Sequence, residues 1–309
     1  MTILPPGLAG FALPSVVLLL GGFAYAAWAD FWEREVTDLL WQVLGVGGFV
    51  IGLLAWFPHG PLPFLLWVLV GVFVLQHLFA WDVRLGPKVE PYADLIEIVI
   101  YVAVTAVVLL ALDRFGLGPN AVPAAVVAVL VTVLFARGLF EAGILFGGAD
   151  AKALMIAGLL VPLFPNPLIP VPASVALLTA ILPFAVNVLM NSALFALVVP
   201  IAIAVRNVRD REFHGWSSFV GYSIPIEELP KQFVWVRDPS FGAAREEEEA
   251  IETSEDDRRR REQIAEDLRA KGVRRIWVTP QIPFLVVMAF GVLGALLAGN
   301  VLFDLLFGL

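Results

Sequence analysis

The sequence predicts an all-α polytopic membrane protein, with about eight transmembrane helices and a small insert in the cytoplasm before the last helix. The first observation is composition: 60% of the 309 residues are hydrophobic, and the mean hydropathy is +0.87. The second is that these residues gather into runs of about 20, the length that a helix needs to cross a bilayer. The third is that the runs are too long and too uniformly apolar for the alternating strands of a barrel.

The apolar runs define the expected elements in chain order. Turn signals such as Pro58-His59-Gly60-Pro61 separate them. The seventh run is too long for one straight crossing and contains Pro183 and Pro200, so we expect a tilt, a kink or an interfacial extension there. The predicted spans lie at 11–30, 39–57, 62–81, 95–112, 121–139, 153–164, 173–205 and 282–303.

The expected domains are a helix bundle over 1–205, a polar insert over 206–280 and a C-terminal transmembrane helix over 281–309. Within the insert, residues 233–236 and 273–278 have the pattern of short strands. The charged run 245–271 between them is typical of a solvated helix capped by Gly272, or of a disordered loop. We therefore predict a mixed α/β or partly disordered insert.

Basic residues set the orientation. If the insert is cytoplasmic, the links after spans one, three, five and seven lie on the same side, and every Lys and Arg except Arg114 falls there. The short links contribute Arg34, Arg84, Lys88, Arg137 and Lys152. The protein is therefore predicted to be a multi-pass protein of the cell membrane.

The charge balance and the missing cysteines restrict the function further. The net charge is −8, and Arg strongly outnumbers Lys, which favours a halophilic source over a GC-rich genome with one acidic loop. The absence of cysteine excludes disulfides, thiolate metal sites and a cysteine nucleophile. Three scattered histidines argue against zinc. We predict no metal, no cofactor and no nucleic-acid partner.

Two carboxylates lie at predicted span ends on the cytoplasmic side. Asp30 closes the first span, and Asp150 precedes the sixth. Two carboxyl groups that share a proton can activate water and polarise a peptide carbonyl, so this pair is a candidate catalytic dyad. The alternatives are that Asp150 caps its helix and that Asp30 is a solvated interfacial acid.

The residues around Asp150 suit a site. Gly147, Gly148 and Ala149 lack bulk, so the backbone of an extended substrate has room to approach. Lys152 is predicted to snorkel to lipid phosphate; the alternative is that it biases the dyad toward ionisation.

Four stretches then carry a family resemblance. Gly147-Gly148-Ala149-Asp150-Ala151-Lys152-Ala153-Leu154-Met155 resembles the Gly-x-Gly-Asp-x-Lys stretch of type IV prepilin peptidases, particularly the archaeal prepilin and preflagellin peptidases. Residues 30–38 are similar to the segment of their first aspartate, 187–207 to the span before their insert, and 278–284 to their archaeal carboxy-terminal signature. The resemblance implies a GxGD-type membrane aspartic peptidase with Asp30 and Asp150 as catalytic residues.

The sequence departs from that pattern at two points. Ala149 stands at the second glycine of the motif, so the turn must accept a Cβ atom, and a positive φ there would be strained. The third and fourth spans, about 62–112, are an insertion relative to a six-helix family. An inserted pair preserves the sidedness of everything after it.

The resemblance implies removal of the short basic leader from archaellin and type IV pilin precursors, at the cytoplasmic face. Bacterial relatives also N-methylate and carry a cysteine-rich insert, so a chain without cysteine is expected to act as a peptidase alone. An acidic collar would attract the leader, or would merely solvate the membrane surface. Its expected members are Glu33, Glu35, Asp38, Glu90, Asp94, Glu97 and Glu141, of which the first three are the candidate substrate-binding acids.

Two other functions remain open at this point. A proton-coupled transporter also uses intramembrane acids, although no inverted repeat is evident and these acids lie at surfaces. A catalytically inactive scaffold of the same fold would fit the change at Ala149. Asn187 and Asn191, one helical turn apart, are expected to join helices, with lining of the active-site cavity as the alternative.

Overall fold

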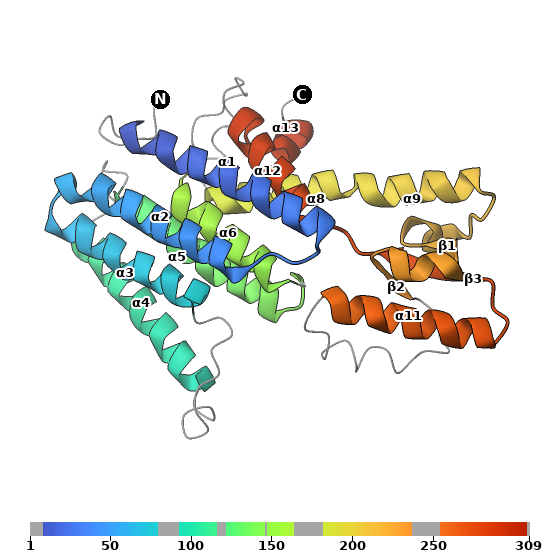
Figure 1. Cartoon of the computed structure of the whole chain (residues 1–309). Coiled ribbons are helices and arrows are strands. Elements are labelled where there is room, and N and C mark those ends of the chain that lie inside the picture. The colour runs from blue at the N-terminus through green and yellow to red at the C-terminus, as the bar shows by residue number, and fades with distance from the viewer. Residues whose placement is uncertain are drawn as a thin grey trace. The chain divides into compact units, whose positions relative to one another are not determined.

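The computed structural model describes residues 9–79, 93–115, 122–145, 147–163, 182–236 and 254–307. Most of its α-helices follow the predicted apolar runs, and α11 and the strands lie in the insert (Figure 1). The α-helices are α1 (Ala9–Trp32), α2 (Asp38–Trp56), α3 (Pro61–Phe79), α4 (Ala93–Phe115), α5 (Val122–Glu141), α6 (Gly148–Leu160), α8 (Phe184–Ala196), α9 (Val198–Arg209), α11 (Ser254–Ala270), α12 (Phe284–Ala298) and α13 (Val301–Phe307). The remaining elements are the 3-10 helices η2 (Phe57–His59), η4 (Gly215–Phe219) and η5 (Ile226–Lys231) and the strands β1 (Tyr222–Pro225), β2 (Val234–Val236) and β3 (Arg275–Pro280).

Several helices are long and apolar enough to cross a membrane. Among the described residues there are five, or six when the bent pair of α12 and α13 counts as one span. This number agrees with a polytopic membrane protein, and the full count of eight stays a prediction. The end of the predicted sixth span and the first part of the seventh, over 164–181, lie outside the described residues.

The chain divides into two compact units, and the first holds most of the apolar helices. It comprises Met1–Trp28, Val36–Leu194 and Leu285–Leu309. Its most buried element is α6, which packs against α2, α3 and α5 and has every residue from Ala151 to Val161 buried. A short helix that is buried all round needs neighbours on every side, so the first turn of α6 has a fixed position within this unit.

The last predicted span is broken, which the hydropathy pattern did not predict. Helices α12 and α13 meet at a bend of 58°. Helix α8 supplies hydrogen-bond partners for the backbone at this break. Asn191 Nδ2 donates to the carbonyl oxygen of Gly299 over 2.8 Å, and the N–H of Val301 donates to Asn191 Oδ1 over 2.9 Å. Asn300 Nδ2 donates to Asn187 Oδ1 over 2.8 Å. These bonds confirm that the two asparagines join helices.

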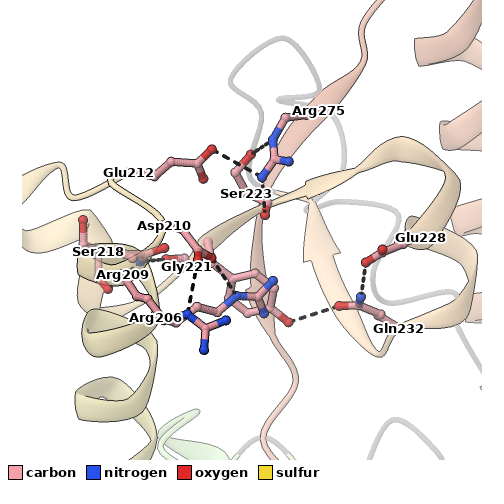
Figure 2. Close-up of polar contacts among 12 residues, drawn as sticks. Arg206, Arg209, Asp210, Glu212, Ser218, Gly221, Ser223, Glu228, Gln232 and Arg275 are labelled. Atoms are coloured by element: carbon pink, nitrogen blue, oxygen red, sulfur yellow. Dashed lines mark hydrogen bonds and ion pairs between the residues drawn. The ribbon is translucent and has the colours of Figure 1, made fainter.

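The second unit is built around a small antiparallel sheet with strand order β1-β3-β2. It comprises Ala29–Glu35 and Phe195–Phe284. Helix α11 and η5 pack on the sheet through a core of Ile224, Ile226, Leu229, Val234, Ala265, Leu268, Ile276 and Val278. Arg275, the first residue of β3, donates to Ser223 and forms an ion pair with Glu212 at 3.3 Å (Figure 2). Strands β2 and β3 lie close to the two segments, 233–236 and 273–278, that the sequence predicts as strands.

The end of α11 confirms the predicted cap at Gly272. This glycine has a φ of 76°, its N–H donates to the carbonyl oxygen of Arg269, and the N–H of Val273 donates to that of Leu268. These two bonds form a Schellman motif, which favours a left-handed residue at this position. Residues 245–253 of the predicted charged run lie outside the described residues.

We predict that Asn191→Ala destabilises the first unit by about 1–3 kcal/mol, because the Gly299 carbonyl and the Val301 N–H would lose their partner at a buried break. Ser192→Ala is the matched control, since its buried hydroxyl donates to the carbonyl oxygen of Val188, one turn earlier in the same helix. The test is thermal unfolding in detergent, followed by tryptophan fluorescence. Equal losses for the two variants would contradict the assigned role of Asn191.

Candidate active site

The turn before α6 holds the Asp150 carboxylate against Gly147. Gly147 is the N-cap residue, with φ −105° and ψ 131°, and its carbonyl oxygen accepts the Asp150 N–H over 3.1 Å. A methyl group on Gly147 would lie 3.1 Å from Asp150 Oδ2, which is tighter than ordinary van der Waals contact. Because Gly147 has no side chain, the Asp150 carboxylate can lie directly beside it.

Asp150 is the third residue of α6 and is partly exposed. A helix begins with N–H groups that have no partner within the helix, and its dipole favours a negative charge in the first turn. This local field stabilises the ionised form of the Asp150 carboxylate.

Ala149 is compatible with the turn. It is the second residue of α6, and it is not among the residues with positive φ in the described part of the chain. A Cβ atom therefore causes no backbone strain at this position, and the concern about a positive φ is removed.

Lys152 does not snorkel, so that prediction was wrong. Its side chain is 3% exposed, and Nζ lies 2.6 Å from Asp38 Oδ1, at the start of α2. A buried ammonium group needs an anionic partner, and Asp38 provides one from 114 positions earlier in the chain. This ion pair fixes the first turn of α6, which carries Asp150, to the first turn of α2.

Asp30 lies in the last turns of α1 and is partly buried. Arg34 follows in a left-handed conformation, with φ 57°. Burial lowers the pKa of the Arg34 guanidinium, and the negative charge of Asp30 opposes this shift. Even so, an arginine stays protonated at any physiological pH, so Asp30 has a permanent positive charge near it.

Two arginines share one aromatic ring in the second unit. The guanidinium carbon of Arg34 lies 5.1 Å from the centroid of the Phe233 ring, and that of Arg261 lies 5.5 Å from it. Arg261 is only 4% exposed. Cation–π contacts are strongest when they are desolvated, so this cluster ties the segment after Asp30 to the insert.

Phe233 and Arg261 were not among the candidate residues. Arg261 belongs to a run of four arginines that suggested a solvated face. The spacing of Arg261, Ala265 and Leu268 on α11 is that of one helix face, and all three are buried. This periodicity was the available signal for a buried arginine.

The acidic collar is partly paired. Arg137 lies 2.7 Å from a carboxylate oxygen of Glu141 and 3.5 Å from one of Glu97. Glu33 and Glu35 are exposed, and Asp38 is half exposed beside Lys152. Glu90 and the side chain of Asp94 lie outside the described residues. Within the described ranges, no three His, Asp or Glu side chains gather closely enough to hold a metal ion.

Residues 215–301 match the family model described as Archaeal Peptidase A24 C-terminus Type II. This match supports membership of the archaeal prepilin and preflagellin peptidase family. Neither the curated proteins nor the solved structures give a significant match. The matched family is one of proteases of the prepilin-peptidase type in the broad sense.

The family match covers most of the insert and all of α12, and it includes neither Asp30 nor Asp150. Asp30 belongs to the second compact unit and Asp150 to the first. Their pairing stays a prediction, as do the substrate-binding roles of Gly147, Gly148 and Ala149.

We predict that Asp38→Asn destabilises the protein by about 1–3 kcal/mol, because the buried Lys152 would lose a charged hydrogen-bond partner. The double variant Asp38→Asn/Lys152→Met removes both charges and should recover at least half of the loss. Thermal unfolding in detergent measures both effects. A double variant less stable than the single one would rule out a buried, uncompensated charge as the cause.

A second prediction concerns Phe233→Leu, which keeps an apolar side chain but removes the ring. Loss of two desolvated cation–π contacts should cost about 1–2 kcal/mol and loosen residues 29–35. Hydrogen exchange at the Glu33 amide, which donates to the Ala29 carbonyl oxygen, reports this loosening. Trp235→Leu, two residues further along and half exposed, is the control. Unchanged exchange in Phe233→Leu would show that the ring does not hold the segment.

Proposed function

We propose that this protein is a membrane aspartic endopeptidase that removes the short basic leader from archaellin and type IV pilin precursors, at the cytoplasmic face of the cell membrane. The observation that carries the proposal is the match of residues 215–301 to the archaeal peptidase family. The local structure around each aspartate adds to it. In this proposal Asp30 and Asp150 face one another across a single water molecule.

The reaction follows from the chemistry of two neighbouring carboxyl groups. The ionised carboxylate takes a proton from water as the water oxygen attacks the amide carbon. The protonated carboxyl group donates a hydrogen bond to the carbonyl oxygen and stabilises the charge that develops there. The tetrahedral intermediate then breaks its carbon–nitrogen bond as a proton passes to the leaving nitrogen. The titration belongs to the pair, because two like charges this close cannot both ionise freely.

The local structures support this chemistry. The start of α6 favours charge on Asp150, and Arg34 favours charge on Asp30. Fixed positive groups would therefore stabilise the one ionised carboxylate, while repulsion between the two acids would keep the second one protonated. Neither group needs a metal ion for this role.

The substrate side of the proposal rests on charge and space. Exposed Glu33 and Glu35 follow Asp30 directly and suit a Lys- and Arg-rich leader. Asp38 keeps half of its side chain exposed while it pairs with Lys152. The backbone of the precursor would lie along Gly147, Gly148 and Ala149, where small side chains permit close approach.

The peptidase family match favours a protease over a proton-coupled transporter. It does not by itself separate an active enzyme from an inactive scaffold. The helical backbone of Ala149 removes the main local objection to activity.

We predict that Asp30→Asn or Asp150→Asn lowers processing of a co-expressed archaellin precursor by about 100-fold or more, since each removes a proton-transfer group. Mass spectrometry of the precursor amino terminus measures the product. Protein levels should stay normal, because each substitution preserves the shape of the side chain.

Asp82→Asn and Asp94→Asn are the controls, as acids predicted at the same membrane face. They should retain most of the activity. Full processing by either Asp30→Asn or Asp150→Asn would eliminate the dyad, and an equal loss in the controls would mean that a different pair does the chemistry. Leader trimming by the purified protein separates a peptidase from a carrier or a scaffold.

A further inference from the structure

Helix α9 ends at a residue with a strained backbone. Arg211 has a φ of 61°, a left-handed conformation that glycine adopts easily and that is unfavourable for a residue with a Cβ atom. Its N–H donates to the carbonyl oxygen of Val208 over 3.2 Å, and the N–H of Glu212 donates to that of Asn207 over 2.9 Å. These two bonds form a Schellman motif, which stops the helix and turns the chain.

After this turn the chain runs back alongside α9. Asn207 Nδ2 donates to the carbonyl oxygens of Ser218, over 2.8 Å, and Gly221, over 2.7 Å (Figure 2). Asn207 is 1% exposed, and helix η4 packs against α9. Residues 211–220, which we call the aromatic loop, are therefore fixed beside the last turn of α9 and do not extend beyond its end.

The aromatic loop presents large apolar side chains to its surroundings. Trp216 is 87% exposed, Phe213 46% and Val220 44%. The Phe219 ring joins them, with its centroid 5.6 Å from that of Trp216 and 6.0 Å from that of Phe213. An exposed apolar cluster of this kind marks a contact with another protein or with a membrane.

The end of α9 indicates the level of the bilayer surface. Helices α8 and α9 form one candidate membrane span, Phe184–Arg209, and the last turn of that span carries Arg206 and Arg209. Charged side chains avoid the hydrocarbon core, so this turn lies among the headgroups when the helix crosses the membrane. The lipid-facing side of α9 is then formed by its exposed apolar residues Val198, Ile201, Val205 and Val208.

The aromatic loop shares the level of this last turn, because it is bonded to Asn207. Tryptophan is favoured at that level, since its ring is apolar and its N–H needs a polar partner. The Arg209 side chain is 84% exposed, so its guanidinium group can reach lipid phosphate. Position and composition therefore both favour a lipid contact.

We propose that the aromatic loop is a lipid-contact site, in which Phe213, Trp216 and Val220 insert among the headgroups and upper acyl chains at the bilayer surface where α9 ends. The bilayer is the partner because the loop and the end of a membrane span belong to the same compact unit and are joined by two buried hydrogen bonds. This contact holds the first part of the insert at the membrane surface. The inference does not depend on the proposed peptidase activity.

The experiment uses the absence of cysteine, which makes every introduced cysteine a unique labelling site. Trp216→Cys and Val220→Cys receive a spin label, and the full-length protein is placed in nanodiscs of phosphatidylglycerol and phosphatidylcholine. Depth is measured from the relative accessibility of the label to oxygen and to a water-soluble nickel reagent. Ile201→Cys and Val208→Cys, on the lipid-facing side of α9, calibrate the depth scale. Glu266→Cys, exposed on α11, is the aqueous control.

We expect the labels at 216 and 220 to lie at a depth close to that of the label at 208. The label at 201 should lie deeper by about 10 Å, the rise of seven helical residues. Equal depths at 201 and 208 would show that α9 does not cross the membrane, which overturns the proposal. Labels at 216 and 220 that are as accessible to nickel as the label at 266 would also overturn it. Protection of both from both reagents would mean that a protein, such as a second copy of this chain, covers the loop, with the same consequence.

A second arm tests the tryptophan itself, with the label at 220 as the reporter. Trp216→Ser should move this label toward water by at least half of its difference from the label at 266, and Trp216→Tyr, which keeps an interfacial ring, should restore most of the depth. Trp235→Ser is the matched control, because Trp235 is half exposed on β2, which β3 separates from β1. An unchanged depth in Trp216→Ser, or an equal shift in Trp235→Ser, would refute the lipid contact of Trp216.

Discussion

The ion pair between Lys152 and Asp38 is the constraint on which the site in the first unit depends. An ammonium group that is 3% exposed is shielded from water, so it needs an anionic partner within the protein. Asp38 opens α2 and Lys152 lies in the first turns of α6, so the pair fixes two helix starts together. The Asp150 carboxylate lies two residues from this point. Its position therefore depends on a contact between residues far apart in the chain, and not only on the small-residue turn before it.

In the second unit, an aromatic ring rather than a carboxylate holds the buried cations in place. Arg34 and Arg261 come from distant parts of the sequence, and both place their guanidinium groups near Phe233. A ring tolerates two cations because its face is negative and its surroundings exclude water. Asp30 precedes Arg34 by one helical turn, so each proposed catalytic acid lies close in sequence to a buried or half-buried cation that a residue from elsewhere holds in place.

The sequence predicted what local composition determines. Hydropathy located most helices within a few residues, and strand patterns located β2 and β3. Sequence reasoning missed contacts that depend on distant partners. The residues around Lys152 do not distinguish a lysine that reaches lipid phosphate from one that pairs with Asp38. The break between α12 and α13 was missed because the apolar run continues through Gly299 and Asn300, although an asparagine within a span was a usable signal. The pairing of Asp30 with Asp150 is of the same non-local kind.

The family match falls on the supporting structure and not on the proposed catalytic acids. Its first part, 215–284, lies in the unit that contains Phe233, Arg261 and the segment after Asp30. Its remainder covers α12 and the break after it, where Asn191 of α8 bonds to the backbone. In this chain the matched region thus contains residues that hold the segment after Asp30 and helix α12 of the bundle. The proposed aspartic proteolysis would need two acids held at one separation, so residues that position the acids would matter as well as the acids themselves. In this chain the insert therefore has a structural task, which is to fix the residues that follow Asp30, besides any contact that it makes with a precursor.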